Sequence, residues 1–534
     1  MRKKYLEHTV LPTDRITTRR RLITEGRSPY SRALRPTHSL GQVHRLYDEL
    51  PPDTATGDTV VLVGRVVAHR AHGGMGFVDL ADGDGDIQLI LSDDAAEAPH
   101  LYASWQADVD LGDHVGVTGE IVTSRTGALS LRVTRWELAT KALRPPPGPA
   151  RVGLRSPRSR GRGRGGERLA TYQRMMLDRR EAARFKGRSA VLRAVRDELH
   201  SAGYLEADTP LLHPVPGGTA LPFQTRMNAW RVPLYLRGST ELYLKRLVVG
   251  GAERVFELGH VFRNEGTGVA NHPEFTVCEA YAAHTDYTVG AETVERLVRA
   301  AAVAIREAEG PTPITRAVLG GSDDRPDHPY RPFTRRSLHQ LLSEHLGEQV
   351  TSATSAETFT RHADRLGLPV PAGTPASALA LLLFRKAVRP TLTEPTFVVD
   401  LPSRAARFAR PCSGDPHLVE AWSLILAGTD IGQGCTELTD PVEQRRRLTE
   451  QQREPGLEHL MLDEDFLAAL EHGLPPLGGF SLGVDRLVGA LRDDGRRLSD
   501  QQCLALERVG ALGRTDGEAP GHGAEQETDR SEAS

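Results

Sequence analysis

Alternation of apolar and polar residues marks five short stretches in the first quarter of the chain. They cover residues 60–68, 76–80, 87–91, 114–122 and 129–133. Glycine and aspartate clusters separate several of them, as turns separate strands. Five short strands within one stretch of domain size predict a small closed β-barrel of the OB type in residues 58–144.

Residues 255–281 show a different organisation. They read VFELGHVFRNEGTGVANHPEFTVCEAY, which is two apolar-rich runs around a short loop that contains glycine. Runs of this kind predict two antiparallel strands joined by a loop.

Polar residues in this stretch are spaced two apart. In an extended strand, residues i and i+2 point to the same face. Arg263 is therefore expected to share a face with Glu265, and Glu279 with Tyr281. Such residues are poor core material and favour the floor of a polar ligand site. A solvated face with cross-strand ion pairs has the same pattern, so the four residues alone leave both interpretations open.

A long helical pattern marks the start of a second predicted domain. It covers residues 169–202, and Gly203 follows as a C-cap. A strand-like run and Pro210 come next. Towards the C-terminus, the glycine-rich run LGGFSLG leads into a helical segment that carries Arg486. These elements predict a second, larger domain in residues 169–509.

Three segments lack both periodicities. Residues 1–57 are charged and turn-rich and predict a loosely attached extension. Residues 145–168 are rich in proline, arginine and glycine and predict a disordered linker. Its arginines would add salt-dependent contacts to RNA phosphates, but a solubilising linker has the same composition. Residues 510–534 predict a disordered polar tail.

Composition narrows the class of protein. The chain has 534 residues, enough for two or three domains, and its formal net charge of −3 predicts no general attraction to nucleic acid. None of the four cysteines lies in a metal-ligand spacing, which argues against a zinc site and a disulfide-built secreted domain. No apolar run is long enough to span a membrane, and the N-terminus lacks the apolar core of a signal peptide. We therefore expect a cytoplasmic protein without membrane contact.

The stretch FRNEG…NHPEF…EAY resembles motif 2 of class II aminoacyl-tRNA synthetases, in the form found in lysyl-tRNA synthetases. The helix and strand before Pro210 resemble motif 1, and the glycine-rich run before Arg486 resembles motif 3. This resemblance covers residues 20–505, with the three motifs in order. It implies an α+β fold, in which an N-terminal OB-type β-barrel precedes a class II synthetase catalytic domain made of an antiparallel sheet flanked by helices.

The resemblance also implies a reaction. Members of the family activate lysine with ATP as an aminoacyl-adenylate and transfer it to tRNA, with Mg²⁺ as a cofactor. ATP, the amino acid and tRNA would then be the partners, and the chain would form a homodimer. Catalysis would depend on positioning and on neutralising phosphate charge. Arg263 and Arg486 match the two catalytic arginines, whose planar guanidinium groups suit phosphate oxygens.

The remaining site residues are implied in the same way. For ATP they are Arg263, Glu265, Asn271, Phe275, Asp430 and Arg486. For the amino acid they are Gly218, Glu241, Glu279, Tyr281, Gln433, Glu437 and Ser481, with carboxylates for both amines of lysine. Phe77 and Gln88 match residues that contact the tRNA anticodon, although composition alone would place Phe77 in the barrel core.

The metal site departs from the family pattern. The family has two acidic ligands seven residues apart, and here these positions hold Ser423 and Asp430. Serine is a poor ligand for Mg²⁺. We expect Asp430 and Glu437 to bind the metal. Residues seven apart in a regular strand face opposite ways, so this expectation requires a bend or bulge between them.

Three further departures touch the amino-acid pocket. Gln433 and Cys435 replace an asparagine and a phenylalanine of the family, and Ser481 replaces a glycine. These changes keep two alternatives open. One is a paralogue that activates a different, lysine-like amino acid for a biosynthetic or carrier pathway. The other is a catalytically impaired protein that binds tRNA or an amino acid for regulation, which Ser423 would explain.

Overall fold

The computed structural model describes residues 12–31, 34–72, 74–93, 100–147, 171–216, 218, 220–266, 271–320, 331–454, 457 and 460–495. The chain divides into two compact units, residues 1–182 and 183–534. Most of the predicted linker and the whole predicted tail lie outside the described residues. Among the described helices, none has the length and apolar character needed to cross a membrane.

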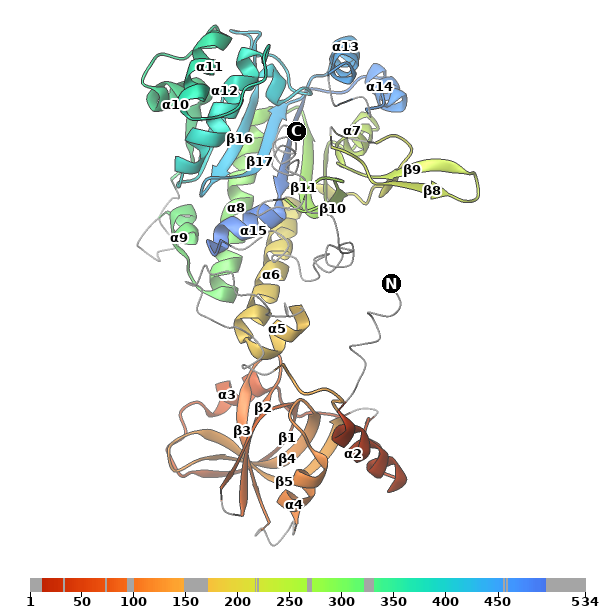
Figure 1. Ribbon diagram of the computed structural model, residues 1–534, viewed down its shortest axis with the longest axis vertical. Helices are drawn as coiled ribbons and strands as arrows, with labels where there is room; N and C mark the ends of the chain where they lie inside the picture. Colours follow the sequence, from red (N-terminus) through yellow and green to blue (C-terminus); the bar gives the residue numbers. More distant parts are fainter. Residues whose placement is uncertain are drawn as a thin grey trace. The chain divides into compact units, whose positions relative to one another are not determined.

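The first unit contains a closed five-stranded barrel with the strand order β1-β2-β3-β5-β4 (Figure 1). The strands are β1 (Ala55–His72), β2 (Met75–Ala81), β3 (Asp86–Ser92), β4 (His114–Thr123) and β5 (Leu129–Thr140); the helices are α2 (Thr13–Thr24), α3 (Leu40–Tyr47) and α4 (Leu101–Asp108). Alternate residues of β2 and β3 are buried, as the period of two requires. The predicted barrel is therefore confirmed, with longer strands than the sequence indicated.

The second unit is built on an eight-stranded sheet with the order β12-β13-β16-β17-β18-β11-β10-β6. Its strands are β6 (Leu205–Glu206), β10 (Arg254–Phe262), β11 (Glu274–Ala283), β12 (Thr334–Ser337), β13 (Thr396–Val399), β16 (Ala421–Leu426), β17 (Thr429–Thr436) and β18 (Leu477–Gly483). Neighbouring strands are antiparallel, except that β6 pairs parallel with β10 and β12 with β13. The predicted antiparallel sheet is confirmed, and only its two edge pairs differ.

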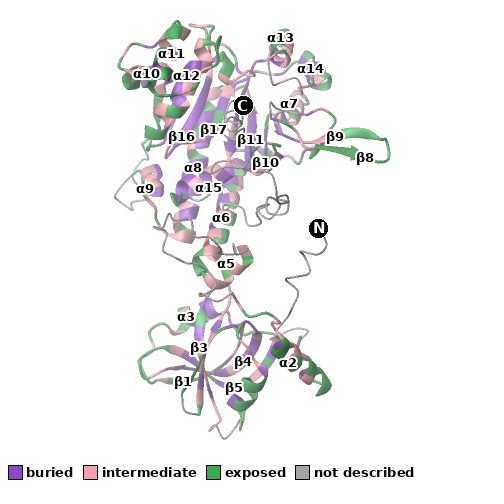
Figure 2. Ribbon diagram, viewed as in Figure 1, coloured by how far each residue is buried: buried purple, intermediate pink, exposed green. Residues whose placement is uncertain are grey.

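Helices flank this sheet. They are α6 (Arg179–Ser201), α7 (Glu241–Val249), α8 (Tyr287–Glu309), α9 (Pro313–Leu319), α10 (Leu338–Leu346), α11 (Ala356–Arg365), α12 (Ala376–Leu383), α13 (Pro441–Gln452), α14 (Glu464–Glu471) and α15 (Val484–Arg492). A further helix, α5 (Thr171–Leu177), belongs to the first unit. Shorter strands are β7 (Leu212–His213), β8 (Gln224–Met227), β9 (Val232–Leu236), β14 (Leu401–Pro402) and β15 (Leu418–Val419). Figure 2 shows the buried residues concentrated in the central strands, whereas β8 and β9 are exposed.

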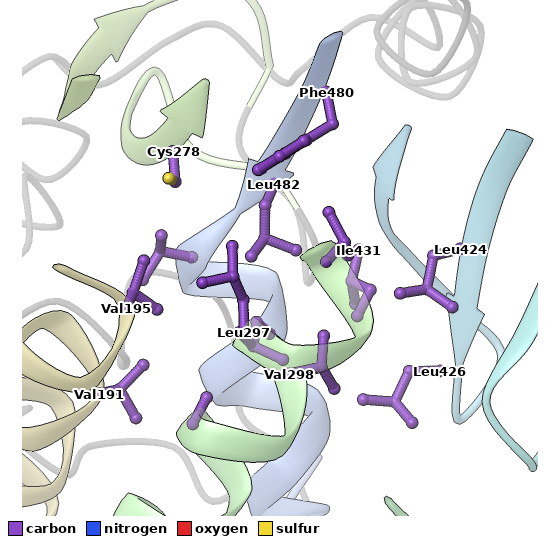
Figure 3. Packing of buried hydrophobic residues seen from close by; sticks show 14 of the residues in the cluster. Val191, Val195, Cys278, Leu297, Val298, Leu424, Leu426, Ile431, Phe480 and Leu482 are labelled. Carbon is purple, nitrogen blue, oxygen red and sulfur yellow. The ribbon is translucent and has the colours of Figure 1, made fainter. Parts of the chain in front are cut away.

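The main core lies between the sheet and helices α6, α8 and α15. Leu297 and Val298 of α8 lie beside Ile431 and Leu482 of the central strands (Figure 3). Asp286 begins α8 because its side chain accepts hydrogen bonds from the backbone N–H groups of the first turn. Since α6, α8 and α15 pack against this face of the sheet, the opposite face is the one available for a ligand site.

Two predictions require correction. The long helix of residues 169–202 is two helices, α5 and α6, because the Asp178 side chain accepts a hydrogen bond from the backbone N–H of Arg180 and caps the second helix. The two predicted strands are β10 and β11, with Phe262 opposite Glu274. Strand β10 ends at Phe262, so Arg263 and Glu265 lie in the loop after it rather than on a strand face.

Candidate active site

Alternate residues of the central strands form the face opposite the main core. On β11 these residues are Glu279 and Tyr281, on β18 they are Gly479, Ser481 and Gly483, and on β17 they are Gln433 and Cys435, followed by Glu437. The intervening residues, including Cys278, Ala280, Phe480 and Leu482, belong to the core. A period of two therefore separates site residues from core residues along β11 and β18, and along β17 from Gly432 onwards.

A bulge in β17 sets which of its side chains reach this face. Gly432 pairs with Leu424 and Asp430 pairs with Ile425, so Ile431 is an additional residue. Its side chain is 1% exposed and lies in the core. Because of this extra residue, Asp430 shares a face with Gln433 and Glu437. The sequence required a bend or bulge here if Asp430 and Glu437 were to share a face, and this bulge is present.

One cavity, of about 90 Å³, is lined by the residues predicted to bind ATP. They are Arg263, Glu265, Asn271, Phe275, Asp430 and Arg486. Arg486, on the first turn of α15, donates to the side-chain oxygen of Asn271 (3.2 Å) and to the backbone carbonyl of Asp430 (3.3 Å). The Arg263 guanidinium carbon lies 5.3 Å from the centre of the Phe275 ring. Two guanidinium groups and an aromatic ring thus line one small cavity, a combination that suits a nucleotide phosphate and base.

A second cavity, of about 210 Å³, is lined by the residues predicted to bind the amino acid. They are Gly218, Glu241, Glu279, Tyr281, Gln433, Glu437 and Ser481. Gly479 forms part of its floor, because a Cβ atom there would lie 2.4 Å from the Tyr281 ring and 2.8 Å from Glu437 Oε1. The cavity therefore depends on the absence of a side chain at this position.

Arg263, Gln433 and Ser481 line both cavities. The two cavities consequently meet at these residues, with one guanidinium group at the junction. Burial lowers the pKa of Arg263, and the neighbouring Arg486 acts in the same direction. Two cations close together beside a buried cavity favour the binding of an anionic group.

Glu279 accepts hydrogen bonds from several donors near the N-terminus of α7. It accepts hydrogen bonds from the Thr240 backbone N–H (2.8 Å), the Thr240 hydroxyl (2.5 Å) and the Ser239 hydroxyl (3.0 Å). Ser481 adds a hydroxyl at 3.3 Å. Burial raises the pKa of Glu279, although the Thr240 and Ser239 hydrogen bonds oppose the rise. The carboxylate is therefore fixed in place by donors from Ser239 and Thr240, which directly precede α7, and from Ser481 on β18.

Lys245, which the sequence did not indicate as a site residue, lies behind the residues that line the second cavity. Its Nζ lies 2.5 Å from Glu241 Oε1 and 2.6 Å from Glu437 Oε2. The same nitrogen lies 4.6 Å from the centre of the Phe408 ring and 5.5 Å from that of Tyr281. The spacing of four between Glu241 and Lys245 was a readable signal of a helical ion pair. The contact with Glu437, 192 positions away, was not.

Burial and neighbouring charges set the pKa values of Lys245 and Glu437. Burial by itself would lower the pKa of Lys245, but the carboxylates of Glu241 and Glu437 outweigh it and raise the pKa above its ordinary value. Burial raises the pKa of Glu437, and the Lys245 ammonium opposes that rise only in part. The Cys435 thiol also donates to Glu437 Oε1 at 3.4 Å.

The structure does not bring the two predicted metal ligands together. Asp430 lines the first cavity and Glu437 the second, where Lys245 holds it. At about 3.3 Å per residue, they lie roughly 20 Å apart along the strand. Ser423 instead donates a hydrogen bond to Asp430 Oδ2 at 2.8 Å. The described residues contain no cluster of three or more metal-ligating side chains, so a Mg²⁺ ion would fit only if ATP phosphates supplied most of its ligands.

In the first unit, Phe77 and Gln88 lie outside the barrel core. Phe77 is half-buried, alternates with the buried Val78, and lies opposite Arg70 of β1. Gln88 accepts a hydrogen bond from Arg70 (3.3 Å) and donates one to Ser130 (3.1 Å). An aromatic ring beside an arginine and an amide is consistent with the stacking surfaces that bind single-stranded nucleic acid.

Comparison with known protein families agrees with both units. Residues 60–139 match the model of the OB-fold nucleic acid binding domain, and residues 167–495 match that of the class II tRNA synthetases for D, K and N. The chain therefore belongs to this class II synthetase family.

Several curated proteins are similar to this chain. The chain is 39% identical to the lysylphosphatidylglycerol biosynthesis bifunctional protein LysX of Mycobacterium marinum over 480 residues. The matched region covers 89% of this chain and 41% of the relative. It is 40% identical over 473 residues to LysX of Mycolicibacterium vanbaalenii, covering 88% of this chain and 41% of the relative. LysX of Nocardia farcinica is 39% identical to this chain over 476 residues, and the match covers 88% of this chain and 40% of the relative. The chain thus spans about two fifths of the length of these relatives.

Proposed function

We propose that this chain activates lysine with ATP as an aminoacyl-adenylate and transfers it to tRNA, as a lysine–tRNA ligase does. The observation that carries the proposal is the position of Arg263, which lines both cavities. Adenylate formation joins the carboxylate of an amino acid to the α-phosphate of ATP. Both groups are anionic, so a guanidinium group at the junction is placed to hold them together.

The reaction needs no nucleophile from the protein. A carboxylate oxygen of the amino acid attacks the α-phosphorus, the bond to the bridging oxygen breaks, and pyrophosphate leaves. Arg263 and Arg486 would share the negative charge that develops on the phosphates. A hydroxyl of the tRNA terminal ribose then attacks the carbonyl carbon, and AMP leaves. A Mg²⁺ ion bound with ATP, with Asp430 as one protein ligand, would supply further charge neutralisation.

The charges of the second cavity favour a diamine. Glu241 and Glu437 share one ammonium group, that of Lys245, whereas Glu279 is bound by Ser239, Thr240 and Ser481. Two carboxylate charges are therefore left for the two ammonium groups of lysine, and Arg263 is left for its carboxylate. The other charged residues that line the cavity have partners of their own: Arg404 and Arg407 pair with Glu454, and Asp463 pairs with Arg246.

A second candidate differs in the acceptor of the activated amino acid. The similar proteins carry the name of lysylphosphatidylglycerol biosynthesis, so this chain would supply activated lysine, or a lysine-like amino acid, to such a pathway. Cys435 and Ser481 favour a lysine-like amino acid as the substrate of this candidate, because both line the second cavity and both depart from the lysyl-tRNA synthetase pattern.

ATP–pyrophosphate exchange with a panel of amino acids tests the proposal. We expect lysine or a lysine isomer to give the fastest exchange, and leucine to give none above background. Acceptor assays with tRNA and with phosphatidylglycerol vesicles then separate the two candidates. If none of the amino acids in the panel supported exchange, both candidates would be contradicted and a regulatory binding protein would be favoured.

A further inference from the structure

The ammonium group of Lys245 occupies an enclosure of two carboxylates and two aromatic rings. Its side chain is 2% exposed, and it lies behind the wall that its partners Glu241, Tyr281, Phe408 and Glu437 present to the second cavity. An enclosure of this composition is what an ammonium ligand requires. Here the protein fills it with a side chain of its own.

The two oxygens of Glu437 have different neighbours. Oε2 accepts a hydrogen bond from Lys245 Nζ at 2.6 Å. Oε1 lies next to the Cys435 thiol, and next to Gly479, where a Cβ atom would approach within 2.8 Å. Since Cys435 and Gly479 line the cavity, Oε1 is the oxygen on the cavity side.

We propose that Lys245 is a positioning residue that sets substrate specificity: it binds Glu437 Oε2 from behind, so that Glu437 presents Oε1 to the distal ammonium group of the substrate. This inference rests on the proposed function, since it concerns how the same cavity selects a diamine. Lys245 acts through Glu437 and does not itself contact the substrate.

Electrostatics explains why the lysine is needed. Burial favours the neutral form of the Glu437 carboxyl, and a neutral carboxyl attracts an ammonium group far less strongly than a carboxylate does. Removing Lys245 removes the cation that favours ionisation. The other titratable or charged groups that line the same cavity are Glu241 on α7; Glu279 and Tyr281 on β11; Cys435 on β17; Arg263; Arg404 and Arg407, which pair with Glu454; and Asp463, which pairs with Arg246. Of these, Glu241 opposes the ionisation of Glu437 and would do so unbalanced without Lys245.

A competing interpretation uses the same contacts. Lys245 could replace the distal ammonium of the substrate, and the substrate side chain would then be neutral. Norleucine, which has no distal amine but a straight aliphatic side chain, distinguishes the two. We expect the wild type to bind lysine in strong preference to norleucine, and equal binding would overturn the inference.

The experiment compares Lys245→Met with the wild type in ATP–pyrophosphate exchange and in calorimetric titrations with lysine and norleucine. At neutral pH, we expect the KM for lysine to rise roughly 10- to 100-fold, with a smaller change in kcat and none in norleucine binding. Alkaline pH should restore part of the loss, because Glu437 ionises again while the substrate amine stays charged to about pH 9. Glu437→Gln should show the same loss without recovery.

Control variants separate positioning from folding. Lys245→Arg keeps the charge and should retain most of the preference for lysine. Lys141→Met removes another buried lysine, one that pairs with Asp110 and Asp113 in the barrel, and should leave lysine binding unchanged. If Lys245→Met fails to fold, the double variant with Glu437→Gln leaves no unpaired carboxylate at that position and should discriminate as poorly as Glu437→Gln alone.

The outcomes distinguish the inference from the proposed function. A wild type that binds lysine selectively but exchanges no pyrophosphate would contradict activation and leave the role of Lys245 supported by the calorimetry. Unchanged lysine affinity and an unchanged pH profile in Lys245→Met would overturn the inference while activation stands. A wild type that binds no lysine would also overturn it.

Discussion

At the scale of single residues, Gly479 shows how little space the amino-acid cavity has to spare. Gly479→Ala would place a methyl group 2.4 Å from the Tyr281 ring, which is closer than any ordinary contact. Overpacking of this kind costs about 1–3 kcal/mol, so we expect the KM for the amino acid to rise about tenfold or more and ATP binding to persist. Steady-state kinetics with each substrate varied in turn measures both effects.

The matched control is Gly290→Ala on α8. A Cβ atom there has its closest neighbour, the Gly479 backbone oxygen, at an ordinary 3.7 Å. Alanine in place of glycine within a helix adds roughly 1 kcal/mol of stability. An equal rise in KM in both variants would show that the cavity is not what Gly479→Ala changes.

Ser423 gives a second prediction at this scale. Its hydroxyl bonds to Asp430 and provides no charge, so we expect activation to be slow and to need unusually high magnesium. Ser423→Glu should lower the half-saturating magnesium concentration roughly tenfold, because a charged contact contributes about 1.5 kcal/mol or more. Exchange rates measured over a range of magnesium concentrations provide the readout.

Ser423→Gln serves as the control for size without charge, and should not change the magnesium requirement. If the wild type already runs at ordinary magnesium and Ser423→Glu abolishes activity, the nucleotide cavity works with serine as it stands, and our placement of the metal is wrong.

At the scale of elements, strand β2 carries the prediction about RNA. Phe77 lies on the outer face of β2, opposite Arg70, where it can stack on a base. Stacking of an aromatic side chain contributes about 1–3 kcal/mol per base. Phe77→Ala should therefore weaken tRNA binding roughly 5- to 100-fold in filter or fluorescence assays, while lysine activation without tRNA is unchanged.

Leu89 on β3 offers a contrast within the same barrel, because it is fully buried. Leu89→Ala should lower the unfolding temperature of the barrel, whereas Phe77→Ala should alter it little. Equal loss of stability in the two variants, with no change in tRNA affinity, would mean that Phe77 serves packing alone.

Elements with a strong period were predictable from the sequence, and their interruptions were not. The strands around the FRNEG run and the glycine-rich strand before Arg486 appear where the pattern puts them. The break at Asp178 was missed because a single side-chain cap leaves the helical period on both sides intact. The bulge at Ile431 was anticipated only as a condition, since its position depends on pairing with β16.

The candidate site was predictable to the extent that sequence motifs contain it. The predicted ATP and amino-acid residues line two adjoining cavities. Lys245 could not be assigned, because its contact with Glu437 joins segments far apart in the chain. The pairing of Asp430 with Glu437 was misleading for a related reason. Sharing a face of a strand does not bring two side chains close when several residues separate them.

At the scale of the whole molecule, homodimer formation remains a prediction. Strand β6 is the edge of the large sheet, and its Leu205 is 61% exposed; Phe185 of the preceding helix is 49% exposed. An exposed edge with apolar side chains favours pairing with a second copy. We expect light scattering to give twice the chain mass, and Leu205→Lys with Phe185→Glu to give the single mass.

Val442→Lys on α13 is the control, because Val442 is an even more exposed apolar residue on a different element. It should leave the mass unchanged. A wild type with the mass of one chain at every concentration would remove the homodimer from the description of this protein.

The bulge of β17 also bears on how such a chain can change over evolutionary time. After the bulge, Gln433 lines both cavities and Cys435 lines the amino-acid cavity, whereas Asp430 before the bulge lines the nucleotide cavity. Substitutions at Cys435 can therefore alter substrate choice while the use of ATP is inherited unchanged. If β17 instead paired as a regular strand with Ile431 in register, Asp430 would turn towards the core. The residue type at Cys435 can therefore vary between lineages of this protein, whereas the bulge at Ile431 must be kept for Asp430 to face its cavity.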